Sequence, residues 1–288
     1  MGGQERAATL RGGVRLLGQA IAAWRRDDGL RLGAALSYYT AFSLAPMLIL
    51  SVAIAGLVFG TEAASGRIVA ELRGLMGPDG ASAIQTLIQS ASVRPGAGVG
   101  ASVFGFATIL FGASGAFGEL QNALNEIWKA EPKTNGGWRH LLRTRLVSFS
   151  MVLVIGFLLL VSLVVSAALA ALDGLAGDVG SFAPLLALVN GLLSYAVITL
   201  LFALIFRVLP DTRIAWRHIW PGAAFAAALF VIGKFAIGFY IGSTAVASVY
   251  GAASSLAVLL LWVYYSSQSL FIGAELSQVL CQRHAVSS

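Results

Sequence analysis

The stretch Leu146–Leu172, LVSFSMVLVIGFLLLVSLVVSAALAAL, contains no charged residue. A helix that crosses the hydrocarbon core of a bilayer needs about 20 mostly apolar residues, and this stretch exceeds that length. A helix that is apolar on every side is either buried in a large core or spans a membrane. We therefore begin with a transmembrane helix here and work outward from it.

The composition of the whole chain supports a membrane protein. Of the 288 residues, 58% are hydrophobic and only 11% are charged, and the mean hydropathy is +0.82. Soluble domains carry about 25% charged residues, so this chain has too few to cover a soluble globule. The bilayer must take the remaining apolar surface, and only helices or closed barrels satisfy their backbone there.

Further charge-free runs set the other predicted spans. Near the C-terminus, Lys234 interrupts a stretch that is long enough for two crossings, and the least hydrophobic part, 242–251, marks the break between them. The predicted fold class is therefore all-α, a polytopic membrane protein with six transmembrane helices. The predicted spans are about 34–59, 98–118, 146–172, 183–206, 219–241 and 252–280.

Lysine and arginine residues predict the orientation. Fifteen lie in the N-terminal arm, the second and fourth connections and the C-terminal tail, whereas the alternate connections hold only Arg67, Arg73 and Arg94. Cytoplasmic segments carry such an excess. Both termini are therefore expected in the cytoplasm of a bacterial cell, and the net charge of +6 needs no nucleic acid to explain it.

Amphipathic segments flank the predicted six-helix domain, residues 32–281. In the cytoplasmic arm, 1–31, an apolar stripe recurs at helical spacing among arginines, which suits an anionic membrane surface. Residues 61–96 predict an extracytoplasmic helical cap, which either covers a pathway or only plugs the bundle. Residues 282–288 form a short cytoplasmic tail. The stripe of the arm consists of Leu10, Val14, Leu17, Ile21 and Trp24.

Three charged residues fall inside or at the ends of the predicted spans, where charges are costly and often functional. They are Lys234, Glu275 and Glu119. At about 1.5 Å per residue, Lys234 and Glu275 differ in depth by roughly 13 Å, too far for a direct pair. Glu275 is instead expected to pair with Arg207, Arg145 or Arg143, and Lys234 either faces a polar cavity or snorkels outward.

Polar-tipped residues inside the spans are further candidates for the lining of a cavity: Tyr38, Tyr39, Tyr264, Tyr265 and Gln268. No catalytic constellation is evident. The three histidines are scattered without a metal-ligand spacing, and no glycine-rich loop ends in Gly-Lys-Ser/Thr. We therefore expect no enzyme, no cofactor and no metal.

Several short motifs follow one another in a fixed order along the chain. They are Ala34-Ala35-Leu36-Ser37-Tyr38-Tyr39, Ser43-Leu44-Ala45-Pro46, Ala123-Leu124-Asn125-Glu126-Ile127-Trp128, Leu209-Pro210, Ser248-Val249-Tyr250-Gly251, Leu261-Trp262-Val263-Tyr264-Tyr265 and Gly273-Ala274-Glu275-Leu276. In their order and spacing they resemble the YihY/BrkB family of bacterial inner-membrane proteins. The resemblance covers roughly 27–280, with Ala45-Pro46 in place of the more usual Phe-Pro of the first span.

The resemblance implies a six-helix inner-membrane protein linked to envelope integrity, serum resistance and export of lipids. It brings no agreed substrate and no catalytic residues. The family was once labelled ribonuclease BN. Metal-assisted phosphodiester hydrolysis needs clustered carboxylates or histidines, and the cytoplasmic connections of this chain offer no such cluster.

Two functions of different classes remain open. The first is a transporter, or a transport component, for lipids or other amphiphiles across the cytoplasmic membrane. The second is an envelope scaffold or assembly protein that transports nothing. Membrane lipids are the expected partners, with self-association or an envelope protein compatible with either function, and nucleic acid is not expected.

Overall fold

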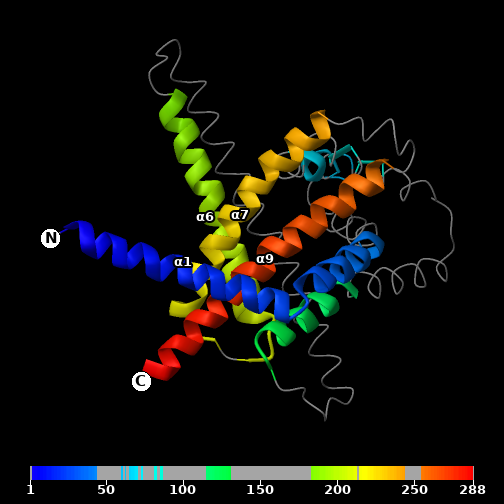
Figure 1. Cartoon of the computed structure of the whole chain (residues 1–288). Coiled ribbons are helices and arrows are strands. Elements are labelled where there is room, and N and C mark those ends of the chain that lie inside the picture. Colours follow the sequence, from blue (N-terminus) through cyan, green and yellow to red (C-terminus); the bar gives the residue numbers. More distant parts are fainter. Residues whose placement is uncertain are drawn as a thin grey trace. The chain divides into compact units, whose positions relative to one another are not determined.

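The computed structural model describes residues 2–43, 60, 62, 65–70, 73, 81–82, 85–86, 115–130, 183–212, 214–243 and 254–287. Within these ranges the chain is helical and contains no strand. The long helices are α1 (Gly2–Arg26), α6 (Ala183–Val208), α7 (Trp216–Ser243) and α9 (Ser254–Ser287) (Figure 1). Shorter helices cover 29–43 and 115–127. The predicted all-α class therefore holds for the described residues.

Three of the described helices are long and apolar enough to cross a membrane. Their candidate spans are Leu188–Val208, Trp216–Ile237 and Leu256–Arg283. These segments coincide with the last three predicted spans, whose crossing of a membrane stays a prediction. The other three predicted spans, 34–59, 98–118 and 146–172, lie mostly or wholly outside the described residues, as does most of the predicted cap at 61–96.

The ends of the helices follow from local sequence. α6 stops before Pro210, because a residue that precedes proline is disfavoured in the helical region. α1 stops at Arg26, and Asp28 then adopts a left-handed conformation with φ of 52°. A left-handed residue just past a helix end is a common C-terminal cap. The next helix begins at once, at Gly29.

The most buried residues of α1 are small, and the predicted apolar stripe is buried only in part. Ala20 and Ala23 are buried, whereas Val14 is 70% exposed and Ile21 is 44% exposed. Leu17 and Trp24, also of the stripe, are half-buried. The helix itself was predicted correctly, and its position on a membrane surface stays a prediction.

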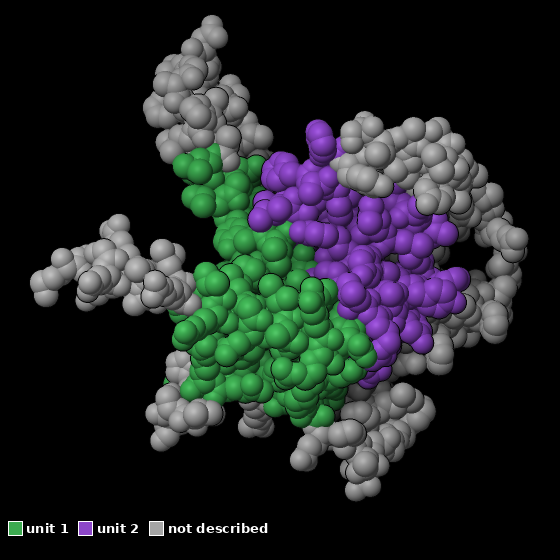
Figure 2. Space-filling view, in the orientation of Figure 1, with its two compact units in different colours: residues 1–29, 124–229, 269–288 green, residues 30–123, 230–268 purple. Residues whose placement is uncertain are grey.

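The chain divides into two compact units (Figure 2). Unit 1 comprises 1–29, 124–229 and 269–288, and unit 2 comprises 30–123 and 230–268. Both units take residues from α7 and from α9.

Unit 1 is held together by a close approach of α7 and α9. Gly222 of α7 lies against Gly273 of α9, and a Cβ on Gly222 would overlap the Gly273 carbonyl oxygen and Ser277 Oγ. The hydroxyl of Ser277 donates to the carbonyl oxygen of Ile219 at 3.4 Å. Such small-residue contacts let membrane helices approach closely where apolar burial gives little driving force.

Unit 2 repeats this kind of packing with larger partners. The amide of Gln268 lies directly on Gly33, and the Tyr265 ring lies on Gly233. The rings of Phe230 and Trp262 pack with their centroids 5.3 Å apart. Glycine at positions 33 and 233 thus makes room for side chains of α9.

Candidate functional site

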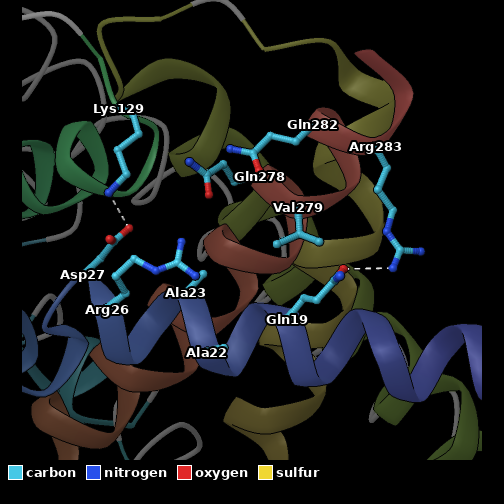
Figure 3. Close-up of a pocket in the computed structure, with 10 residues that line it drawn as sticks. All are labelled: Gln19, Ala22, Ala23, Arg26, Asp27, Lys129, Gln278, Val279, Gln282 and Arg283. Atoms are coloured by element: carbon cyan, nitrogen blue, oxygen red, sulfur yellow. Dashed lines mark hydrogen bonds and ion pairs between the residues drawn. The ribbon is translucent and has the colours of Figure 1, made fainter. Parts of the chain in front are cut away.

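A pocket of about 460 Å³ in unit 1 lies between α1, the end of helix 115–127 and the last turns of α9 (Figure 3). We call it the α1–α9 pocket. The positions that α1 contributes fall on one face of that helix, at helical spacing. The lining residues are Gln19, Ala22, Ala23 and Arg26 from α1, Asp27 directly after it, Lys129, and Gln278, Val279, Gln282 and Arg283 from α9.

An ion pair closes one end of the α1–α9 pocket. Lys129 Nζ lies 2.6 Å from Asp27 Oδ2, and the Asp27 side chain is 7% exposed whereas that of Lys129 is 56% exposed. A buried carboxylate needs a partner, which Lys129 supplies. At the other end, Arg283 donates from Nη2 to Gln19 Oε1 at 2.8 Å.

The backbone of helix 115–127 places Lys129 at this position. The amide of Ala130 donates to the Asn125 carbonyl at 2.9 Å, and that of Lys129 donates to the Glu126 carbonyl at 3.2 Å. This pair of bonds is a Schellman motif, in which the left-handed position is usually glycine. Here it is Lys129, with φ of 50°. A lysine in that conformation costs free energy relative to glycine.

A reciprocal pair of hydrogen bonds fixes the same helix to the α6–α7 connection. Asn125 Nδ2 donates to Asp211 Oδ2 at 3.1 Å, and the amide of Asp211 donates to Asn125 Oδ1 at 2.8 Å. Arg207 secures the other side of the connection by donating from Nη1 to the carbonyl oxygen of Ile214. These contacts hold the segment that carries Lys129.

The inner end of α9 buries polar groups inside a helix apolar enough to span a membrane. Glu275 and Ser277 are fully buried, and Gln278 is 7% exposed. Both carboxyl oxygens of Glu275 are buried and form no hydrogen bond with the described residues. The charged groups that act on this carboxyl are Asp27, Lys129 and Arg26, the same groups that line the α1–α9 pocket.

The expected pairing of Glu275 with Arg207 is wrong. Arg207 donates to the Ile214 carbonyl instead and lies 6.0 Å from the centroid of the Trp216 ring. The local reason is that Arg207 bridges the ends of the short α6–α7 connection. Arg143 and Arg145, the other expected partners, lie outside the described residues.

The other predicted site residues belong to unit 2, apart from Glu275. Lys234 is half-buried on α7, next to the Gly233–Tyr265 contact. Tyr264 joins Gln268 at Gly33, with its Cε2 3.5 Å from where a Cβ of Gly33 would lie.

The remaining predicted candidates are less enclosed. Tyr38 and Tyr39 are 60% and 45% exposed, with ring centroids 6.0 Å apart, and Glu119 is half-buried on helix 115–127. A cavity role for the candidates in unit 2 stays a prediction.

Sequence reasoning missed the residues that line the α1–α9 pocket. The sequence analysis counted three of them, Arg26, Lys129 and Arg283, only as cytoplasmic charges. It named Asp27 only as the start of the family resemblance. One feature of the sequence could have pointed to the pocket. Two acidic residues, Asp27 and Asp28, directly follow the two arginines that end α1, Arg25 and Arg26. Among the described residues, no group of three or more His, Cys, Asp or Glu side chains is placed to hold a metal ion.

Comparison with known proteins finds relatives over most of the chain. Residues 20–288 match the family Virulence factor BrkB. A UPF0761 membrane protein of Stenotrophomonas maltophilia is 31% identical over 88% of this chain and 58% of its own length. One of Alkalilimnicola ehrlichii is 24% identical over 89% of this chain and 56% of its own length.

One of Verminephrobacter eiseniae is 28% identical over 88% of this chain and 60% of its own length. The chain thus spans somewhat over half the length of these curated relatives. No solved structure matches.

Proposed function

This chain belongs to the Virulence factor BrkB family, whose relatives are membrane proteins, and from that premise we propose that it carries lipids or other amphiphiles across the cytoplasmic membrane. In this proposal both termini face the cytoplasm, and the chain acts without an enzymatic step of its own. It draws on an ion gradient or a partner, or it works passively. Its partners are membrane lipids.

The buried polar end of α9 is the observation that carries the proposal. Glu275, Ser277 and Gln278 are buried within a candidate membrane span. Polar and ionisable groups at such positions are expensive and commonly line a substrate or ion path. A helix that served only as an anchor would gain stability from apolar residues at the same positions.

The α1–α9 pocket adds a place for an amphiphile. Its wall combines charged side chains with the aliphatic side chains of Ala22, Ala23 and Val279. Small-molecule sites are mostly apolar concavities with a few polar groups that orient the ligand. A headgroup on the charged side and a hydrocarbon on the aliphatic side would both find matching surfaces.

The α6 surface also suits lipid contact. Most of its candidate span is not buried within the protein, and Leu188, Val189 and Leu192 are exposed. In a bilayer, this surface would meet acyl chains or another protein.

Reconstitution in liposomes tests the proposal. Purified protein is incorporated with a fluorescent phospholipid, and a membrane-impermeant quencher reports movement between leaflets, with and without an ion gradient. We expect movement above that of protein-free vesicles, and a loss of it in folded Lys234→Met and Glu275→Gln proteins. If folded wild-type protein moves no lipid under either condition, the scaffold function takes its place. A scaffold should tolerate both substitutions in an envelope-integrity assay.

A further inference from the structure

Cationic side chains line both ends of the α1–α9 pocket. Lys129 stands at one end with Asp27, and Arg283 stands at the other with Gln19 (Figure 3). Arg26 lines the pocket and makes no hydrogen bond or ion pair with the described residues. Three cations and one carboxylate leave the lining with a formal charge of two positive.

The donors that remain can still reach a ligand. A guanidinium carries five N–H donors in a planar fork, and Arg283 uses one nitrogen on Gln19. Lys129 has a side chain that is 56% exposed, and its ammonium has donors beyond the one directed at Asp27. Planar guanidinium groups suit phosphate oxygens, which they bind in a bidentate manner.

Gln278 points independently to a polar ligand. Its side chain is 7% exposed and lines the pocket. A glutamine amide at such a position offers an NH₂ donor to a ligand in the pocket. In Figure 3 the Gln278 amide lies among the pocket residues, between the Lys129 end and the Arg283 end. An anion bound there would accept from its NH₂ group.

From this arrangement we infer that the α1–α9 pocket binds a phosphate-bearing anion, to which Arg26, Arg283 and Gln278 donate. Asp27 does not oppose this binding strongly, because it is paired with Lys129 and keeps that lysine at the rim. Glu275 lies outside the lining. The inference rests on the proposed function in that it names the chemical class of the amphiphile, but its test measures binding alone.

The test uses the full chain, stripped of lipid, in a neutral detergent. Three probes are titrated: phosphatidylglycerol, phosphatidylcholine as the zwitterionic comparison, and inorganic pyrophosphate for a soluble source. The variants are Arg26→Gln and Arg283→Gln, both at exposed residues. Arg25→Gln is the matched control, because Arg25 is the exposed neighbour of Arg26 on α1 and does not line the pocket. Each variant must elute as wild type before titration.

We expect phosphatidylglycerol to bind more tightly than phosphatidylcholine, and Arg26→Gln and Arg283→Gln each to weaken it by about tenfold, the usual effect of losing one charged hydrogen bond. Arg25→Gln should bind as wild type, and added salt should weaken binding. Saturable pyrophosphate binding with the same pattern of variants would identify a soluble phosphate as the source and also support the site. Equal binding of the two lipids with no binding of pyrophosphate would overturn the inference, as would an Arg25→Gln effect equal to that of Arg26→Gln.

This outcome is separate from that of the transport assay. Wild-type protein that moves lipid but shows no anion selectivity would refute the pocket assignment and leave the proposed function standing. Protein that binds the anion through Arg26 and Arg283 but moves no lipid would support the pocket assignment and refute the proposed transport.

Discussion

Alanine in place of Gly222 should destabilise the α7–α9 contact of unit 1. The added Cβ would overlap the Gly273 carbonyl oxygen, and a backbone atom cannot move away without shifting α9. Overpacking of a well-packed interior costs about 1–3 kcal/mol, and two overlaps place this site at the upper end. Alanine regains about 1 kcal/mol of helix propensity over glycine. The expected net loss of unfolding free energy is therefore about 2 kcal/mol.

The measurement is unfolding in a titration with sodium dodecyl sulfate, followed by circular dichroism. Gly191→Ala on α6 is the matched control, because nothing lies within 4 Å of the Cβ that it adds. That variant should be unchanged or more stable by up to about 1 kcal/mol. Gly273→Ala should lose stability too, since its Cβ would lie 2.6 Å from both Ala226 Cβ and the Gly222 carbonyl oxygen. Gly222→Ala protein as stable as Gly191→Ala protein would refute the close approach.

Three further predictions use the same titration. Asn125→Ala should cost about 2 kcal/mol, because it removes both hydrogen bonds to Asp211 at about 1 kcal/mol each; a loss below about 0.5 kcal/mol would contradict that contact. Lys129→Gly and Lys129→Ala should both destabilise the protein, because each leaves the buried Asp27 carboxylate without its ion pair; Lys129→Ala, which keeps the left-handed strain, should be the less stable of the two by about 0.5–1 kcal/mol, and equal stability of the two would contradict the strain. Glu275→Met should stabilise by about 1–3 kcal/mol, because it removes a buried carboxyl that has no hydrogen bond among the described residues; destabilisation would reveal a partner for it.

The membrane-spanning helices could be predicted because their signal is local. A long uninterrupted apolar run indicates a membrane span from its own composition, and the runs at 183–206 and 252–280 reappear as α6 and α9. Lys234 did not mislead the prediction of α7, since a single charge does not end a helix. The helix in the N-terminal arm was visible for the same reason, as a periodic pattern.

The pocket could not be predicted because its parts are far apart in the chain. Asp27 and Lys129 follow the ends of two helices and Gln278 lies on a third, and no periodicity states which helices are neighbours. The packing face of α1 was missed because helical periodicity selects large apolar residues. Helices that approach closely use small ones, here Ala20 and Ala23.

The expected pair of Glu275 with Arg207 failed for a related reason. Depth along a helix limits which charged side chains can meet. It does not show whether a backbone carbonyl binds the arginine in place of the carboxylate. The Ile214 carbonyl, seven residues after Arg207, takes the guanidinium. A short connection that returns on itself leaves such carbonyls within reach of the last residue of the helix.

The most direct test of transport compares wild-type and Glu275→Gln proteins in liposomes that contain labelled phosphatidylglycerol. Glutamine keeps the size of the side chain and removes its acidic group from the buried end of α9. The proposed function predicts that wild-type protein moves the lipid between leaflets faster than protein-free vesicles do, and that the folded variant has lost most of this activity. Wild-type movement no faster than in protein-free vesicles would contradict it.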